Sequence, residues 1–191
     1  MINEIKKQLL ESAEVKKASS EILSQKIEEA VLKIHNAFLE ENKVFFIGNG
    51  GSAADAQHIA AEFVGHFKKD RKPLPALALT TNTSNITAIG NDYDFDLIFA
   101  RQLEGLSKMG DILVAISTSG KSSNIIRAVE TAKNFGVITI GLLGKNGGLL
   151  KDMVDIAIVV PSDDTQRIQE THITIGHIIC DLVEQKLFPN L

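Results

Sequence analysis

Five short apolar runs, separated by stretches of helical periodicity, constrain the fold of this chain more than any other feature of its sequence. The runs cover residues 44–47, 76–79, 112–116, 137–140 and 156–160, and the helical stretches cover 52–67, 83–90, 95–107, 122–135, 147–152 and 165–187. Continuous apolar strands that alternate with helices form parallel sheets covered on both faces, with right-handed connections. We therefore predict an α/β fold with a doubly wound, five-stranded parallel sheet flanked by helices.

The first forty or so residues lie outside this alternation. Residues 2–41 contain no Gly or Pro, and their apolar residues recur at roughly helical spacing with Lys and Glu between them. This pattern predicts one long helix, either continuous or broken near Ala18–Ser20. Such a helix packs across its own domain or against another subunit, and the sequence leaves both open. The length of 191 residues leaves room for one domain, so 1–191 is expected to be a single domain.

Charge and cysteine content exclude several classes of protein. Lys and Arg number 20 and Asp and Glu number 24, a net charge of −4, which argues against broad binding to nucleic-acid phosphates. The single cysteine, Cys180, excludes an intramolecular disulfide and a cysteine-based zinc cluster, and suits a reducing compartment. No basic segment followed by an apolar run opens the sequence, and no apolar run approaches the roughly 20 residues of a membrane span. We expect a cytoplasmic protein with no nucleic-acid or membrane partner.

A glycine-rich loop follows the first predicted strand. Residues 48–53 read Gly-Asn-Gly-Gly-Ser-Ala, which fits G-x-G-x-x-A and, taken alone, is the dinucleotide-binding fingerprint. That interpretation needs an acidic residue at the end of the second strand, and residues 76–81 contain none. The loop still suits an anion, because glycines let it approach the backbone and the next helix offers unpaired N–H groups. Alternatively, Ser52 only caps the helix, with Asp55 completing a capping box.

A second polar loop follows the third predicted strand. Residues 117–122 read Ser-Thr-Ser-Gly-Lys-Ser, and hydroxyls with backbone N–H groups at a helix start suit a phosphate monoester. The loop lacks the G-x-x-x-x-G-K of a P-loop, and the alternative is an ordinary turn. Parallel sheets bind ligands outside the carboxyl ends of their strands, which is where both polar loops are placed.

Two pairs of polar residues lie on predicted helices. His58 and Glu62 are spaced i, i+4 on one helix face after the glycine loop, while Gln169 and His177 lie on the last helix. Together they suit a zinc site or an acid/base pair; the alternative is a solvated His and Glu with a packed histidine. Gln169 and His177 are about 12 Å apart along a helix, too far to bind one ion from one straight helix. Either Gln169 lies at a frayed helix start, or the two come from different subunits.

Taken in order, these motifs resemble the bacterial phosphoheptose isomerases, a family of the sugar isomerase (SIS) domain superfamily. The resemblance rests on Gly48-Asn49-Gly50-Gly51-Ser52, Asp55-Ala56-Gln57-His58 with Glu62, Gly90-Asn91-Asp92, Ile116-Ser117-Thr118-Ser119-Gly120, and Arg167-Ile168-Gln169-Glu170 with His172. It runs in order across essentially the whole chain and includes the long first helix.

The resemblance implies conversion of D-sedoheptulose 7-phosphate to D-glycero-D-manno-heptose 7-phosphate, the first step toward the activated heptoses of lipopolysaccharide or capsule. It also implies a cytoplasmic homotetramer with active sites at subunit interfaces and one zinc ion per subunit. The implied zinc ligands are His58, Glu62, Gln169 and His177. The implied substrate contacts are Asn49, Gly50, Gly51, Ser52, Asn91, Asp92, Ser117, Thr118, Ser119, Ser122 and Gln169. Gln166 stands where relatives are expected to have Asp or a small residue, which argues against a substrate contact there.

Aldose–ketose isomerisation moves a proton between C1 and C2 through an enediol(ate). Glu62 is the candidate base and His177 the candidate acid, and each group can contribute about 10²–10⁴-fold. A zinc ion would stabilise the developing enediolate charge. Because a metal-bound carboxylate is a weaker base, either Glu62 leaves the metal during turnover or the zinc chiefly orders the site.

An alternative function comes from a sister group in the same superfamily. That group keeps the fold and the tetramer but binds the replication initiator DnaA, and residues 180–182 and 187–189 are similar to it. It is expected to lack the catalytic glutamate and the final histidine. Glu62 and His177 are both present, which favours the enzyme.

Overall fold

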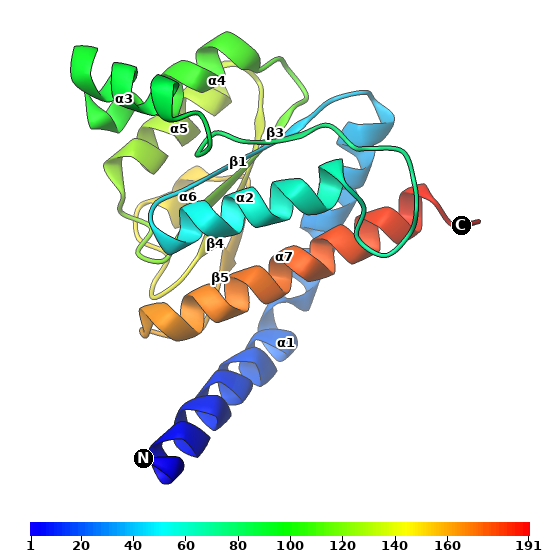
Figure 1. Ribbon diagram of the computed structural model, residues 1–191, viewed down its shortest axis with the longest axis vertical. Helices are drawn as coiled ribbons and strands as arrows, with labels where there is room; N and C mark the ends of the chain where they lie inside the picture. The colour runs from blue at the N-terminus through cyan, green and yellow to red at the C-terminus, as the bar shows by residue number, and fades with distance from the viewer.

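The chain builds an all-parallel sheet of five strands in the order β2-β1-β3-β4-β5, with helices on both faces (Figure 1). The computed structural model describes residues 1–191. The strands are β1 Val44–Gly48, β2 Ala76–Ala78, β3 Ile112–Ser117, β4 Ile138–Leu143 and β5 Ile156–Val159. The predicted doubly wound sheet is confirmed, and β4 runs beyond its predicted end because the chain stays extended and buried as far as Leu143.

The helices agree with the predicted alternation except in one place. They are α1 Ile2–Leu39, α2 Gly51–Val64, α3 Thr83–Asp92, α4 Ala100–Leu106, α5 Ser123–Asn134, α6 Leu150–Met153 and α7 Thr165–Leu187, with a 3-10 turn η1 at Phe95–Leu97. The single helix predicted over 95–107 is wrong. The Asp94 carboxylate accepts a hydrogen bond from the Asp96 N–H and starts η1, and α4 begins only after Phe99, which is buried. None of the helices has the length and apolarity needed to span a membrane.

Each strand supplies side chains to both faces of the sheet. Val44 and Phe46 of β1 join a core that includes α1, α2 and α7, whereas Phe45 and Ile47 join a second core that includes α4, α5 and α6. Successive side chains of a strand point to opposite faces. Two buried faces therefore explain why the strands read as continuous apolar runs rather than as alternating ones.

The long first helix is continuous, so the alternative of a break near residues 18–20 is wrong. Ser19 Oγ donates to the Val15 carbonyl at 2.8 Å and Ser20 Oγ to the Lys17 carbonyl at 2.7 Å, so both hydroxyls are satisfied inside the helix. The second half of α1 packs on the sheet through residues such as Ile27 and Ile34. The first half projects away from the rest of the chain (Figure 1) and exposes Ile2, Ile5, Leu9 and Leu10.

His172 is buried between α7 and the end of β4, with no exposed surface. Its Nε2–H donates to the Leu143 carbonyl at 2.8 Å, and its Nδ1 has no partner. Burial lowers the pKa of His172 to about 4, although the hydrogen bond to Leu143 acts in the opposite direction. The imidazole is therefore neutral in the folded chain at any pH near neutrality.

This burial predicts a loss of stability in mild acid. Between pH 6.5 and the folded-state pKa of about 4, the unfolded chain binds a proton at His172 that the native chain does not. The free energy of unfolding should thus fall with pH, by about 1.4 kcal/mol per unit and about 3 kcal/mol in all. In His172→Gln, which can donate to Leu143 but does not titrate, urea denaturation should show a shallower fall over this window. An equally steep fall in the variant would contradict the assignment.

Candidate active site

Two polar loops lie side by side at the carboxyl edge of the sheet: the glycine loop, residues 48–53, and the serine loop, residues 117–122. The first follows β1 and the second follows β3, and these strands are hydrogen-bonded neighbours with Gly48 opposite Ile116. The strand order reverses direction between β1 and β3, and open α/β sheets bind ligands at such a switch point. The topology therefore brings together two polar loops that lie far apart in the sequence.

A reciprocal pair of amides joins the two loops. Asn49 Nδ2 donates to Asn124 Oδ1 at 2.8 Å, and Asn124 Nδ2 donates to Asn49 Oδ1 at 2.9 Å. Asn124 lies in the first turn of α5 and is 2% exposed. Sequence reasoning missed it, because its partner is 75 residues away. Asn49 thus holds the loops together through its side chain, which leaves its backbone for any ligand.

Helix α2 begins inside the glycine loop, almost directly after β1 ends. Gly50 is the N-cap residue with a φ of +55°, and no side chain caps the helix. Ser52 is buried inside the first turn, so the alternative in which it only caps the helix is wrong. A Cβ at Gly48 would lie 2.4 Å from the Ser52 carbonyl oxygen. Glycine is therefore required at 48 for the helix to turn this closely over the strand end.

The serine loop is braced by its own hydroxyls and by a neighbouring loop. Ser117 Oγ accepts from the Gly120 N–H at 3.2 Å and lies 3.4 Å from Ser122 Oγ. Ser119 Oγ accepts from the Lys121 N–H at 3.2 Å. Gly120 has a φ of +63°, and a Cβ there would lie 1.9 Å from the Gly147 carbonyl oxygen. The Ser117 and Ser122 hydroxyls therefore lie together at the end of β3, and the loop packs directly against Gly147.

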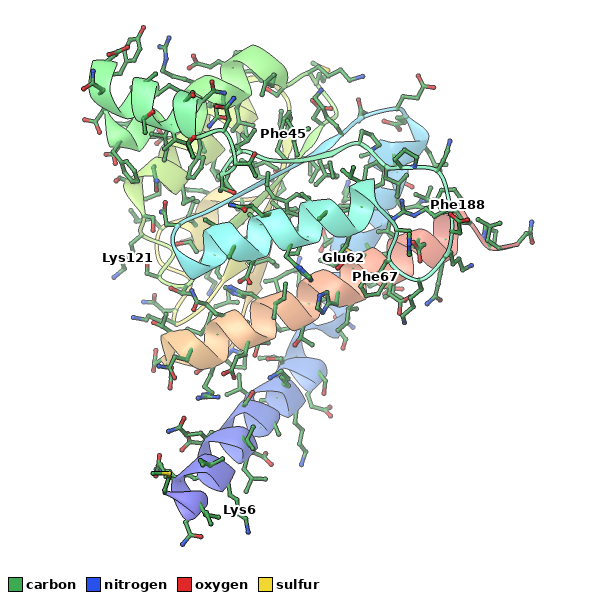
Figure 2. All side chains as sticks on the ribbon, viewed as in Figure 1. Lys6, Phe45, Glu62, Phe67, Lys121 and Phe188 are labelled. Carbon is green, nitrogen blue, oxygen red and sulfur yellow. The ribbon has the colours of Figure 1, made fainter.

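Three of the predicted metal ligands meet between α2 and α7. His58 Nε2 lies 2.9 Å from His177 Nε2 and 3.3 Å from Glu62 Oε1, and one ligand atom from each of the three lies within 4.8 Å of the others. The side chains of His58 and Glu62 are 50% and 22% exposed. Figure 2 shows Glu62 on the side of α2 that faces α7. We call these three residues the triad.

The triad depends on a close approach of two parallel helices. α2 and α7 run side by side in the same direction (Figure 1), with Gly51 against the Gln169 side chain near their N-terminal ends. A Cβ at Gly176 would lie 2.5 Å from Ile59 Cδ1. Gly176 and Ile59 directly adjoin His177 and His58 in the sequence. The absence of a side chain at 176 therefore lets the two imidazoles meet.

Gln169 does not join the triad within one chain. Helix α7 is regular from Thr165, and the Asp164 side chain caps it by accepting from the Gln166 N–H at 2.8 Å. The alternative of a frayed helix start is therefore wrong. Gln169 lies beside Gly51, about 12 Å along the helix axis from His177.

The other predicted contacts lie in separate places. Asn91 and Asp92 are the exposed last residues of α3, where Asn91 Nδ2 donates to Asp92 Oδ1 at 2.8 Å, and no hydrogen bond joins them to the loops or the triad. Asp55, which the sequence places in a family motif and in a possible helix-capping box, has a buried Oδ2 without a partner. Burial raises the pKa of Asp55, against the opposing charges of His58 and His177. This carboxyl therefore borders the triad, one turn before His58.

The triad offers the donor set that zinc prefers. Imidazole nitrogen and carboxylate oxygen bind Zn²⁺ at about 2.0–2.2 Å, so ligand atoms around a tetrahedral ion lie about 3.3 Å apart. The separations of 2.9 and 3.3 Å are close to that value. A structural zinc site takes four protein ligands and a catalytic one takes three with an open position. The residues present thus fit a metal ion with one coordination position left for another ligand.

Comparisons with known proteins show the family to which the chain belongs. A family model described as SIS domain matches residues 9–144, which defines the class of protein. The phosphoheptose isomerase of a Nitratiruptor species is 56% identical over 97% of this chain and 99% of that protein. The solved structure of the Neisseria gonorrhoeae phosphoheptose isomerase matches with a TM-score of 0.92 at 41% identity, over 97% of this chain and 100% of that one. The solved structure of the Francisella tularensis phosphoheptose isomerase matches with a TM-score of 0.93 at 39% identity, over 96% of this chain and 98% of that one. The chain belongs to the phosphoheptose isomerase family of SIS domain proteins.

A substitution at Gly176 tests the helix contact beneath the triad. Gly176→Ala should lower the free energy of unfolding by about 1–3 kcal/mol, because the added methyl overpacks against Ile59, and should move His58 away from His177. Gly105→Ala is the matched control, since Gly105 lies in α4 and a Cβ added there would meet no other atom within 4 Å. That change should stabilise the chain by about 0.5–1 kcal/mol. Urea denaturation of both variants measures the difference, and equal effects would contradict the close contact.

Proposed function

We propose that this protein isomerises D-sedoheptulose 7-phosphate to D-glycero-D-manno-heptose 7-phosphate, the first step toward activated heptoses for lipopolysaccharide or capsule. The observation that carries the proposal is the triad between α2 and α7, in which His58 follows Gly51 by seven residues on α2, in a chain 56% identical to a phosphoheptose isomerase. The simplest test is to incubate the purified protein with sedoheptulose 7-phosphate and measure the aldose product. No product above a no-enzyme control would remove the proposal.

The two loops are proposed to bind the sugar phosphate. Hydroxyls and backbone N–H groups at the starts of α2 and α5 suit a phosphate dianion and the sugar hydroxyls. The proposed substrate contacts are Asn49, Gly50, Gly51, Ser52, Asn91, Asp92, Ser117, Thr118, Ser119, Ser122 and Gln169. In this arrangement Asn49 contributes its backbone, because its side chain is paired with Asn124.

Glu62 and His177 are proposed as the base and the acid. Glu62 takes the proton from C1 of the ketose while His177 gives a proton to O2, which leaves a neutral enediol. The hydroxyl proton of O1 then returns to His177 as Glu62 delivers its proton to C2, which forms the aldehyde at C1. Both side chains reach the same point, since each has a ligand atom within 4.8 Å of the other. Glu62 and His177 are also the two residues that the initiator-binding sister group is expected to lack.

The metal is proposed to be one zinc ion per subunit. His58, Glu62 and His177 would hold it, and when bound it would act as a Lewis acid that stabilises negative charge developing on the sugar oxygens during proton transfer. Gln169 is proposed as a further ligand contributed by a neighbouring subunit, because its own chain places it about 12 Å along α7 from His177.

A homotetramer with active sites at subunit interfaces is part of the proposal. The projecting half of α1 exposes Ile2, Ile5, Leu9 and Leu10, an apolar surface that another subunit can cover. A groove between α1 and α7 adds further apolar side chains, among them Ile178 and Leu182. We further propose a single domain over 1–191 in the cytoplasm, where the free thiol of Cys180 stays reduced.

Replacing the proposed base should stop the reaction without unfolding the protein. Glu62→Gln keeps the shape of the side chain but cannot accept a proton at neutral pH, so kcat should fall by about 10²-fold or more. Glu104→Gln, on the exposed surface of α4, is the matched control and should keep the wild-type kcat. Deuterium exchange from solvent into C1 reports the proton transfer itself. Wild-type exchange in folded, metal-containing Glu62→Gln would show that another group is the base.

Zinc should co-purify with the protein when no histidine tag is used. The double variant His58→Ala, His177→Ala removes two of the three donors in the triad and should retain little metal. His35→Ala, on α1, is the control, because His35 contacts only its neighbour Asn36 among polar groups. Elemental analysis of the three proteins decides the point. Equal zinc content in all three would rule out the triad as the site.

A further inference from the structure

A single buried carboxylate organises the segment that connects α2 to β2. Glu184 of α7 is 1% exposed, and its Oε1 accepts from the N–H groups of Lys68 at 2.8 Å and Lys69 at 3.0 Å. Its Oε2 accepts from the Phe67 N–H at 3.0 Å and from Arg71 Nε at 2.9 Å. Four donors therefore converge on one side chain, and we call Arg71 and Glu184 the buried pair.

Arg71 extends the same network to the end of α2. Its side chain is also 1% exposed, and its terminal nitrogens donate to the carbonyls of Glu62 at 3.0 Å, Phe63 at 2.8 Å and Gly65 at 3.2 Å. The last carbonyls of a helix have no partner within the helix. Arg71 therefore supplies the bonds that close the final turn of α2, the turn that carries Glu62.

The segment held by the buried pair also reaches the triad on its other side. The Phe67 ring lies 5.7 Å from the ring of His177, which belongs to the triad, and Figure 2 labels Phe67 along α7. His177 and Glu184 are seven residues apart on α7, so they lie on the same face of that helix. The network thus contacts both helices that supply the triad.

The charge state of Glu184 agrees with its four hydrogen-bond donors. Burial alone would raise its pKa, but the three backbone N–H groups and Arg71 outweigh burial and hold the pKa of Glu184 below its ordinary value. The carboxylate is therefore ionised at neutral pH and keeps all four of its donors.

We propose that Arg71 and Glu184 are positioning residues for the isomerase site. They fix the positions of Glu62 and His177 relative to each other, Glu62 through the last turn of α2 and His177 through the ring of Phe67. This inference rests on the proposed function. Neither residue reaches the reacting atoms: they act on Glu62 through its backbone and on His177 through Phe67. A misplacement of about 1 Å in a catalytic group can lower a rate by about 10²-fold, so small movements of this segment matter.

The test compares Glu184→Gln with Asp181→Asn. The glutamine amide keeps the size of the side chain but places a donor among four donors, which forces the segment to move. Asp181 joins Lys68 to α7 through a surface ion pair at 2.6 Å, so Asp181→Asn removes a link between the same two elements without touching the buried pair. We expect kcat to fall at least 10-fold at nearly unchanged KM in Glu184→Gln, and to stay within twofold of wild type in Asp181→Asn.

A crystal structure of the variant separates positioning from general stability. In Glu184→Gln the separation of Glu62 Oε1 from His58 Nε2, now 3.3 Å, or that of the two imidazoles, now 2.9 Å, should change. Wild-type separations in the variant overturn the proposal whatever its kcat, and so does a wild-type kcat. If the wild-type protein itself forms no aldose, the proposed function fails, and these separations alone decide the positioning role.

A second variant covers the case in which Glu184→Gln does not fold, since breaking a buried ion pair is strongly destabilising. Phe67→Leu keeps an apolar side chain and leaves the buried pair intact, but removes the ring from His177. We expect kcat to fall several-fold at unchanged KM, with a changed separation of His58 from His177. Unchanged values of both overturn the proposal.

Discussion

The contact of α2 with α7 at Gly176 is the interaction on which the arrangement of the site depends. Two parallel helices that carry His58, Glu62 and His177 pack so closely there that a Cβ would lie 2.5 Å from the Ile59 side chain. The same packing brings Gln169 against Gly51 at the glycine loop. Strands β1 and β3 fix where the two loops begin. The packing of α2 against α7 then fixes the position of the triad relative to those loops.

Much of the fold could be predicted because both faces of the sheet are buried. Strands such as β1 and β3 then become continuous apolar runs, which are easy to recognise. The split of 95–107 into η1 and α4 could not be predicted, because the break depends on a hydrogen bond from the Asp96 N–H to Asp94 and on burial of Phe99. The long helix α1 was predicted, but a break near residues 18–20 stayed open, because composition alone does not show that Ser19 and Ser20 bond back to the preceding turn.

Apart from His177, which was grouped with His58 although 119 residues separate them, the site could be predicted only where its chemistry is local in the sequence. The spacing of His58 and Glu62 places both on one helix face, and the two polar loops are recognisable from their composition. Contacts that join distant segments left no such signal: Asn49 with Asn124, and Arg71 with Glu184, which are 75 and 113 residues apart. The capping interpretation of Ser52 and Asp55 was wrong for a different reason: α2 begins at Gly51 with Gly50 as its N-cap, so Ser52 lies inside the first turn.

The parallel direction of α2 and α7 has an electrostatic consequence. Each helix carries a partial positive charge at its N-terminus, and the contact of Gly51 with Gln169 places the start of α2 about one turn along α7 from its N-cap, Asp164. Two dipoles aligned side by side repel each other, so the free protein contains an unfavourable interaction at the edge of the glycine loop. The Asp164 carboxylate that caps α7 already offsets part of this repulsion, and the sugar phosphate proposed to bind at the glycine loop would offset more of it. On that proposal, ligand binding and the association of the two helices would be thermodynamically linked, each favouring the other.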